Sequence, residues 1–292
     1  MAQAHEARAR LCAAHGWDEA QVELVPVLAS GDKIQDRPLA EIGGKALWTR
    51  ELDIWLADGR IDAAVHSMKD VETLRPDAFA FGAILPREDK ADLLLGATSL
   101  ALIPRGARVG TSAPRRAAQL LHARPDLEVV GIRGNVATRI SKLQAGEADA
   151  TFLAAAGLLR LGESSIGVRL DPEEWLPAPA QAAIGIECRS SDQRVKEILS
   201  AIDHNESRVE VLAERALLEG LGGTCHSPIA ALTRHLGDTL HMTAAIYSPD
   251  GAIRIVRDAR FATDDLTAAR TLARDLLEEA PAHVSAHFGG HA

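Results

Sequence analysis

The sequence predicts an α/β fold over roughly its first 200 residues and a small α+β domain after them. In the first part, short apolar runs alternate with segments of helical period, a pattern typical of α/β proteins with a mainly parallel sheet. From about residue 203 a long helical segment precedes three strand-like runs and a last helix. With 292 residues the chain suits two or three domains of about 100–150 residues each.

The first 86 residues are expected to contain two helices and three strands. The helices mix apolar and polar residues at helical period, and Gly59 ends the second one. The strands are short apolar runs, and a glycine-rich segment containing Pro38 predicts a loop between the first strand and the second helix. The expected elements are helix 2–15, strand 22–28, helix 45–58, strand 61–65 and strand 79–85.

The middle of the chain continues the alternation of strands and helices, which ends near residue 203. Its expected elements are a strand ending at 108–110, helix 114–123, strand 127–130, helix 135–145, strand 150–153 and helix 154–161. A Pro-rich stretch at 176–180 then leads into a strand at 183–188. The last part is expected to hold helix 206–220, strands 228–233, 240–247 and 252–259, and helix 264–279.

Composition and charge exclude several classes of protein. The net charge of −9 and the pI of about 5.7 argue against nucleic-acid binding, which needs a basic face. No apolar run reaches ~18 residues, so we expect no membrane span. The three cysteines have no paired spacing, and no CxxC or HExxH motif occurs. We therefore expect a reduced, cytoplasmic protein without a metal site.

The pentapeptide His66-Ser67-Met68-Lys69-Asp70 brings an imidazole, a hydroxyl, an ammonium and a carboxylate to a predicted strand end. Where a strand gives way to a helix, free backbone N–H groups and a positive dipole end are exposed. This edge could hold a carboxylated ligand beside a functional acid. The alternative is a serine helix cap with Lys69 and Asp70 on a solvated first turn.

Five arginines stand out in the middle of this acidic chain. Arg115 and Arg116 follow Thr111 and Ser112 in the first turn of a predicted helix, where their charge opposes the helix dipole. Together with Arg133 they are expected at the carboxyl-end edge of the sheet, where α/β folds bind ligands. Forked guanidinium donors match carboxylates, so the set, completed by Arg139 and Arg160, indicates a ligand with several carboxylates. The alternative is ion pairing with acidic residues at the surface.

A cysteine follows the glycine pair that ends the long helix. Cys225 stands after Gly222-Gly223 and before Pro228, which places it on a loop. A loop thiol suits nucleophilic or covalent attachment chemistry. The alternative, a small buried hydrophobe, suits Cys12 or Cys188 better.

Together these segments closely resemble the porphobilinogen deaminase family of tetrapyrrole synthesis. The matching stretches occur in the family's order and spacing over nearly the whole chain, which is more specific than any one motif. They are Gly43-Gly44-Lys45, Asp62-Ala63-Ala64-Val65-His66-Ser67-Met68-Lys69-Asp70, Val109-Gly110-Thr111-Ser112 with Arg115-Arg116, Arg133-Gly134-Asn135-Val136-Ala137-Thr138-Arg139, Ala155-Ala156-Gly157-Leu158-Leu159-Arg160-Leu161-Gly162, Leu176-Pro177-Ala178, Gly185-Ile186-Glu187-Cys188-Arg189 and Glu214-Arg215.

The resemblance implies two α/β domains like the halves of a type II periplasmic binding protein, plus a small α+β carboxyl-terminal domain. The chain would cross between the two halves near residues 84–90 and 177–183. The expected boundaries are 1–86 with 183–202 for domain 1, 87–182 for domain 2 and 203–292 for domain 3.

The resemblance also implies the chemistry. Members of the family deaminate porphobilinogen and condense four molecules head to tail into the linear tetrapyrrole hydroxymethylbilane, as monomers and without a metal. The cofactor is a dipyrromethane, held here by a thioether to Cys225, and Asp70 corresponds to the catalytic carboxylate. Arg160 and Gln181 would bind substrate. The other expected cofactor-binding residues are Asp32, Lys45, Ser67, Lys69, Thr111, Ser112, Arg115, Arg116, Arg133 and Arg139.

The chain departs from the family pattern at several places. It begins within the helix that follows the family's first strand, so that strand and its Arg-x-Ser turn are missing from this sequence, and we expect a misassigned start or a truncation. Ala180-Gln181-Ala182 replaces Gly-Gln-Gly, and Glu72 replaces a proline. These departures keep two other hypotheses open, a catalytically impaired family member and a non-catalytic binder of a polycarboxylated ligand.

Overall fold

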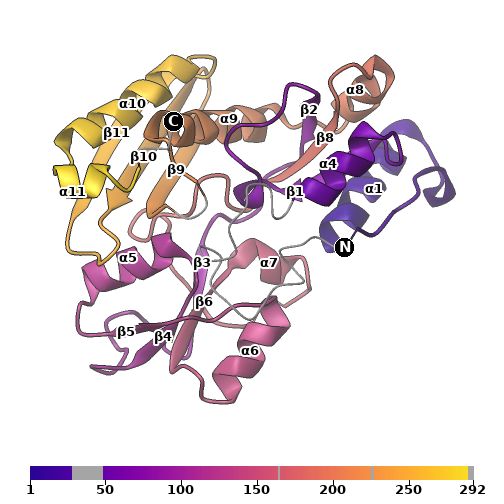
Figure 1. The fold of residues 1–292 in the computed structure, drawn as a ribbon. Helices are drawn as coiled ribbons and strands as arrows, with labels where there is room; N and C mark the ends of the chain where they lie inside the picture. Colours follow the sequence, from indigo (N-terminus) through magenta and orange to yellow (C-terminus); the bar gives the residue numbers. More distant parts are fainter. Residues whose placement is uncertain (28–48, 164, 225–226, 289–292) are drawn as a thin grey trace.

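The computed structural model describes residues 1–27, 49–163, 165–224 and 227–288, which form three β-sheets with helices packed against them (Figure 1). Two mixed α/β units and one antiparallel unit agree with the predicted fold class. None of the helices in these ranges is long and apolar enough to span a lipid bilayer.

The first sheet has three strands in the order β1-β8-β2. The strands are β1 (Ala63–Ser67), β2 (Phe79–Ile84) and β8 (Ile184–Arg189). β8 runs antiparallel to both neighbours, and Ser67 pairs with Ile184 at the end of β1. The helical segments of this part are α1 (Ala2–His15), η1 (Glu19–Gln21), α4 (Arg50–Ala57) and α8 (Gln193–Ser200). Ala7, Ile186 and Leu199 show how α1, β8 and α8 meet in one apolar core.

The second sheet has five strands in the order β5-β4-β6-β3-β7. The strands are β3 (Asp92–Leu95), β4 (Arg108–Gly110), β5 (Glu128–Val130), β6 (Ala150–Ala154) and β7 (Val168–Arg169). β4 is parallel to β5 and β6, whereas β3 is antiparallel to β6 and β7. The helices of this part are α5 (Pro114–Ala123), α6 (Val136–Gln144) and α7 (Ala155–Leu159).

The third sheet is an antiparallel meander in the order β11-β10-β9. Its strands are β9 (Ile229–Leu236), β10 (Thr239–Tyr247) and β11 (Arg254–Ala262). The helices of this part are α9 (Asn205–Leu221), α10 (Leu266–Glu279) and α11 (Ala282–Ser285). Leu217 of α9, Met242 of β10 and Leu272 of α10 are buried in the core between the sheet and these helices.

The chain passes from the first sheet to the second between β2 and β3, and returns between β7 and β8. Glu214 of α9 forms hydrogen bonds with both crossings. Its carboxylate accepts hydrogen bonds from the Arg87 guanidinium at 3.0 and 2.8 Å and from the Ala180 backbone N–H. In the second crossing, Ala180 (φ 58°) and Ala182 (φ 71°) are the described non-glycine residues with left-handed backbone. The family's glycines suit this backbone better.

Two features of the expected fold are wrong. The sheets are not mainly parallel: in the described residues only β5, β4 and β6 pair in parallel. β8 runs antiparallel to β1 and β2, and β3 runs antiparallel to β6 and β7. The described part of the strand expected at 22–28 has no regular structure. Pro26 lacks the N–H that a paired strand needs, and Val25 is exposed.

Other differences concern element ends and short elements. The second helix begins at Arg50, and residues 45–48 of the expected range lie outside the described residues. The expectations omitted β3, β7, α8 and α11, all eight residues or shorter. Short elements give too few periods for a pattern to be recognised.

Candidate active site

The site is built where β1 ends and a short 3-10 helix, η2 (Met68–Asp70), begins. The Met68 N–H donates to the carbonyl of Ala183 at 3.0 Å, and the Met68 side chain is buried. A Cβ atom on Gly185 would lie 2.1 Å from the Met68 sulfur, so glycine at 185 leaves the space that Met68 fills. Met68 thereby anchors the turn that presents Asp70.

The solvated-cap alternative for this motif does not describe the structure. Ser67 precedes η2 but makes no side-chain cap hydrogen bond. Lys69 and Asp70 are half-buried rather than fully exposed. His66 is buried beside Glu187, with 3.0 Å between His66 Nε2 and the carboxylate, and faces a structural network rather than solvent.

The charges around Asp70 are mostly positive. Burial lowers the pKa of Lys69, and the charges of Arg116 and Arg139 lower it further, against the attraction of Asp70 and Asp92. Burial also lowers the pKa of Arg139 to about 10, helped by Arg116 and Arg133 and opposed by Asp70. Both side chains therefore stand where an additional anion would be stabilising.

Arg115 and Arg116 meet a buried aspartate that the sequence expectations did not include. Asp92, at the start of β3, is fully buried. Its carboxylate accepts from Arg116 Nη2 at 2.6 Å and from Trp175 Nε1 at 2.9 Å, and lies 2.8 Å from Arg115 Nη2. Burial alone would raise the pKa of Asp92, but the two arginines outweigh it and lower the pKa far below its ordinary range.

The predicted ion-pairing alternative for these arginines therefore holds in part, but the pairs are buried and not at the surface. Arg115 also donates to the carbonyl of Leu176 at 2.9 Å, and Arg116 to the carbonyl of Phe152 at 3.1 Å. The signal that could have identified Asp92 is a lone carboxylate directly before the apolar run 93–95. A buried strand start tolerates such a charge only with partners.

The ends of β4 and β5 bring further expected residues together. Ser112 Oγ donates to the carbonyl of Ile132 at 3.0 Å, which ties the segment after β4 to the segment carrying Arg133. Thr111 is buried, and its hydroxyl accepts from the Ala113 N–H at 3.2 Å. β4 and β5 are parallel neighbours, so both segments lie at one edge of the sheet, as expected.

Arg139 stands at this edge as well. Asn135 caps α6 by accepting from the Thr138 N–H at 2.9 Å, which fixes the helix start. Arg139, in the first turn and a half of α6, donates from Nε to the carbonyl of Gly134 at 2.9 Å. The charges of Arg116 and Asp70 act on this guanidinium in opposite directions, Arg116 lowering its pKa and Asp70 raising it.

Arg160 and Gln181, the expected substrate-binding residues, already have protein partners. Arg160 donates from Nε to Glu6 of α1 at 3.2 Å and from Nη2 to the carbonyl of Ala182 at 3.1 Å. Gln181 is buried, and its amide nitrogen donates to Asp92 at 3.0 Å and to the Lys90 carbonyl at 2.7 Å. Arg160 is half-buried, whereas Gln181 is buried against Asp92.

Three expected residues, Asp32, Lys45 and Cys225, lie outside the described residues. The start of the cysteine loop is described. Gly222 ends α9 in the left-handed conformation (φ 61°), and the Gly223 N–H donates to the Leu218 carbonyl at 2.9 Å. The Thr224 N–H donates to Ser227 Oγ at 3.2 Å across the loop.

A charged network lies beneath the first strand, around Arg75. Its guanidinium donates to Asp53 of α4, to Glu187 of β8 and to Glu72 three residues before it. Burial lowers the pKa of Arg75, but the hydrogen bonds to Asp53 and Glu187 outweigh burial and raise it. Glu72, which departs from the family's proline, is thus accommodated by an arginine on the same turn.

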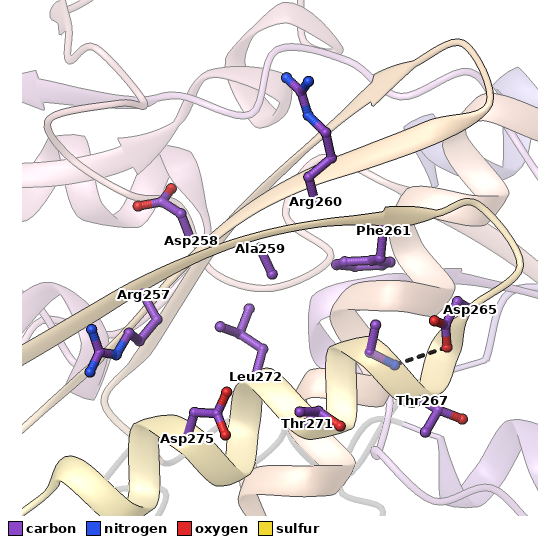
Figure 2. Close-up of a pocket in the computed structure, with 11 residues that line it drawn as sticks. Arg257, Asp258, Ala259, Arg260, Phe261, Asp265, Thr267, Thr271, Leu272 and Asp275 are labelled. Atoms are coloured by element: carbon purple, nitrogen blue, oxygen red, sulfur yellow. Dashed lines mark hydrogen bonds between the residues drawn. The ribbon is translucent and has the colours of Figure 1, made fainter.

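The third sheet carries an open hollow of about 400 Å³ (Figure 2). It lies between β11 and α10, and its charged side chains have mixed sign. Asp265 accepts from the Ala268 N–H at 3.0 Å and caps α10. Arg257 pairs with Glu279 at 2.7 Å. These groups serve the local structure, and the hollow adds nothing to the cluster around Asp70.

Two protein-family models match most of this chain. A family model described as "Porphobilinogen deaminase, dipyromethane cofactor binding domain" matches residues 1–197. A second, "Porphobilinogen deaminase, C-terminal domain", matches residues 208–281. The Sphingopyxis alaskensis protein named porphobilinogen deaminase is 53% identical, over 99% of this chain and 93% of that protein.

Two further relatives carry the same name. The Paracoccus denitrificans protein is 46% identical over 97% of this chain and 91% of its own length. The Xanthomonas axonopodis protein is 46% identical over 92% of this chain and 90% of its own length. Among solved structures, the BvgS periplasmic VFT2 domain of Bordetella pertussis covers 73% of this chain and 82% of its own, at 17% identity and a TM-score of 0.40. That structural score is too low to carry an argument. The sequence matches show that the chain belongs to the porphobilinogen deaminase family.

Proposed function

We propose that this chain is a transferase that deaminates porphobilinogen and condenses four molecules head to tail into the linear tetrapyrrole hydroxymethylbilane, using a covalently bound dipyrromethane primer. Family membership over nearly the full length supports this activity. The observation that carries it is the half-buried Asp70, at the end of η2, near the cationic side chains of Lys69, Arg116 and Arg139.

The donor set fits a dipyrromethane. That group bears acetate and propionate side chains, and Lys69 and Arg139 stand beside Arg116, whose positive charge adds to burial in lowering the pKa of both. When bound, the cofactor supplies a free α-carbon to which the next pyrrole is joined. We propose that Cys225 forms the thioether.

In each addition the C–N bond of the substrate's aminomethyl group breaks, ammonia leaves, and the substrate is left as a cation conjugated with its pyrrole nitrogen. The bound dipyrromethane would supply the free α-carbon for the new C–C bond and would give up the proton of that carbon. We propose that Asp70 accepts the pyrrole N–H and stabilises the cation through a negative charge placed where positive charge develops. Placing that charge in a partly buried position strengthens the effect.

We propose roles for the remaining residues from their positions. The basic residues of the cluster bind carboxylates directly. The hydroxyl groups of Ser67, Thr111 and Ser112, together with Asp32 and Lys45, add hydrogen-bond donors or acceptors. Arg115 and Gln181 are both buried against Asp92. The proposed cofactor-binding residues are Asp32, Lys45, Ser67, Lys69, Thr111, Ser112, Arg115, Arg116, Arg133 and Arg139, and the proposed substrate-binding residues are Arg160 and Gln181.

We also propose three domains, with boundaries at 1–86 plus 183–202, 87–182 and 203–292. The two crossings between the first and second sheets support the discontinuous first domain. We propose that the protein acts as a cytoplasmic monomer. The thiols of Cys12 and Cys188 support a reducing compartment. Light scattering at working concentrations tests the oligomeric state.

Intact-protein mass before and after incubation with porphobilinogen tests the function. We expect a mass above the sequence value by one dipyrromethane, which grows in one-pyrrole steps with substrate. The Cys225→Ser variant should carry no added mass, because it lacks the thiol that forms the thioether. A wild-type mass that equals the sequence value and does not change with substrate would contradict the proposal.

A further inference from the structure

The five residues that follow Asp70 form an irregular segment, residues 71–75, which we call the post-aspartate turn. Its conformation is not fixed by a helix or a strand. Leu74 is 73% exposed, so apolar packing holds only part of it. Polar contacts from other elements must therefore define its shape, and two of them come from α9 and the residues directly after it.

Arg215 of α9 is the first contact. Its side chain is buried, and it donates to the backbone carbonyls of Val71 at 3.4 Å, Glu72 at 2.6 Å and Thr73 at 2.9 Å. Burial lowers the pKa of Arg215 to about 10, with Arg75 adding to the decrease and the charges of Glu187 and Glu72 opposing it. Within the described residues, no carboxylate forms an ion pair with this guanidinium.

The choice of partners is informative. Burying a charge is costly, and buried arginines are ordinarily compensated by a carboxylate. Arg87 on the first crossing is an example, since Glu214 faces it at 2.8 Å. Arg215, the very next residue of α9, is instead used on three consecutive carbonyls of one turn. A buried charge used in this way fixes backbone shape.

Thr73 is the second contact. Its hydroxyl donates to the carbonyl of Gly223 at 3.0 Å. Gly223 lies directly after the left-handed Gly222 that ends α9, and two residues before Cys225. The post-aspartate turn is thus bonded both to the body of α9 and to the start of the cysteine loop, as the course of α9 beside β2 in Figure 1 allows.

Arg75, the last residue of the turn, bonds the turn to the first sheet and to α4. Its guanidinium joins Glu72 of the turn to Asp53 of α4 and Glu187 of β8, at 3.0, 3.1 and 2.8 Å. The turn is therefore fixed to the first sheet at one side and to α9 at the other. The post-aspartate turn thus connects Asp70 to the start of the cysteine loop.

The geometry points to Arg215 and Thr73 as positioning residues that set the separation between the catalytic carboxylate and the start of the cysteine loop at Gly223. This inference rests on the proposed function, in which the pyrrole chain is attached at Cys225 and its reacting end must meet substrate beside Asp70. Neither residue needs to touch substrate. A misplacement of about 1 Å between reacting groups can cost about 100-fold in rate, so such a connection affects catalysis more than binding.

The test uses Arg215→Lys, which keeps the charge but loses the forked donors, and Thr73→Val, which keeps the volume but loses the hydroxyl. For both, we expect the dipyrromethane mass to be retained. We expect kcat to fall about 10-fold in Arg215→Lys and about threefold in Thr73→Val, with KM for porphobilinogen within about twofold of wild type. Thr73→Ser, which restores the hydroxyl, should recover wild-type kcat.

Matched controls separate positioning from general stability. Arg124→Lys removes a guanidinium that donates to the carbonyls of Leu100 and Ile103 in the second domain, and Thr239→Val removes a hydroxyl that donates to the Leu236 carbonyl. Both controls should keep kcat while changing Tm by a similar amount. The double variant of Arg215 and Thr73 should lose no more than Arg215→Lys alone, because the two act through one turn.

Three results would overturn the inference. One is wild-type kcat in both variants while the wild-type protein elongates normally, which leaves the proposed function intact. Another is an equal loss of kcat in the controls, which would make the effect one of stability. The third is a wild-type protein that gains no mass with porphobilinogen, which would overturn the proposed function and the inference together.

Discussion

The two aspartates at the centre of the molecule differ in how completely they are paired. Asp92 is fully buried, faces two guanidinium groups, and accepts from an indole and an amide. Asp70 is half-buried, and within the described part of the chain its carboxylate accepts no hydrogen bond. A carboxylate with every lone pair occupied holds the structure together, whereas one with free acceptor capacity can receive a ligand's N–H.

The same contrast extends to the cations. Arg115 and Arg116 are drawn inward by Asp92, and burial lowers the pKa of Arg115. Lys69 and Arg139 face each other's charge and that of Arg116 without an equal number of anions. The charges around Asp92 therefore stabilise the folded protein. The positive charges around Asp70 cost some folding stability, and a bound anionic ligand would neutralise them.

The largest expected effect separates the aspartates by activity. Asp70→Ala should lower kcat by at least about 10³-fold, because it removes the charge placed to stabilise the substrate cation. Its Tm should stay within a few degrees of wild type, since no ion pair of the core is lost. Steady-state turnover and thermal unfolding measure the two quantities.

Two companion variants define the cause of that loss. Asp70→Asn keeps the shape and should lose nearly as much turnover, which assigns the effect to charge. Asp62→Ala removes an exposed aspartate at the other end of the same strand and should keep full turnover. Substantial turnover in Asp70→Ala would contradict the role assigned to this residue.

Asp92→Asn should produce the opposite profile, a large loss of stability. It leaves two buried guanidiniums without a negative partner, which costs about 3–5 kcal/mol of unfolding free energy. Asp89→Asn is the matched control, because Asp89 pairs with Arg169 at the surface and the loss there should stay below about 1 kcal/mol. Urea unfolding at neutral pH distinguishes the two, and equal losses would refute the structural role of Asp92.

The same pair makes the protein sensitive to acid. The folded-state pKa of Asp92 lies below its unfolded value, so its contribution to stability is present above about pH 3.9 and is lost as pH falls toward the folded pKa. The unfolding free energy of wild type should therefore fall more steeply below about pH 4 than that of Asp92→Asn.

These contrasts also explain what could be predicted from sequence. The motif around Asp70 and the residues after β4 and β5 were predictable, because a local pattern places each at the end of a strand and parallel neighbours share an edge. The partners of Asp92 were not, since they are 23 residues or more away in sequence and no local pattern identifies them, although the apolar run after Asp92 marks the carboxylate itself. The antiparallel return of β8 was missed for the same reason, because strand neighbours depend on the crossings.

Lys69→Met should show how much folding stability the charge of Lys69 costs when no ligand is bound. The pKa of Lys69 is lower in the folded protein than in the unfolded chain, so the folded state binds fewer protons between the two values and stability rises with pH through that window. Removing the charge at neutral pH should therefore raise the unfolding free energy by about 1 kcal/mol while lowering turnover. Lys142→Met, at a surface pair with Glu147, should change both little. If Lys69→Met lowered the unfolding free energy, the negative charges of the cluster would already balance its positive charges without a ligand.

The smallest expected effect concerns the second crossing, which brings Gln181 to Asp92. Ala182→Gly should stabilise the protein by about 0.5–1 kcal/mol, because a left-handed backbone costs a non-glycine residue about 1–2 kcal/mol and glycine's greater unfolded freedom offsets only part of that. Ala180→Gly should gain less, since its methyl group packs with Met68 and Val71 and is worth about 0.8 kcal/mol when buried.

The control is Ala145→Gly, at φ −76°, which should lose about 0.5–1 kcal/mol. Because the crossing supports Asp92 and not Asp70 directly, turnover at a temperature well below Tm should be unchanged in Ala182→Gly. A change in turnover without a change in stability would show that the crossing acts on the Asp70 side as well.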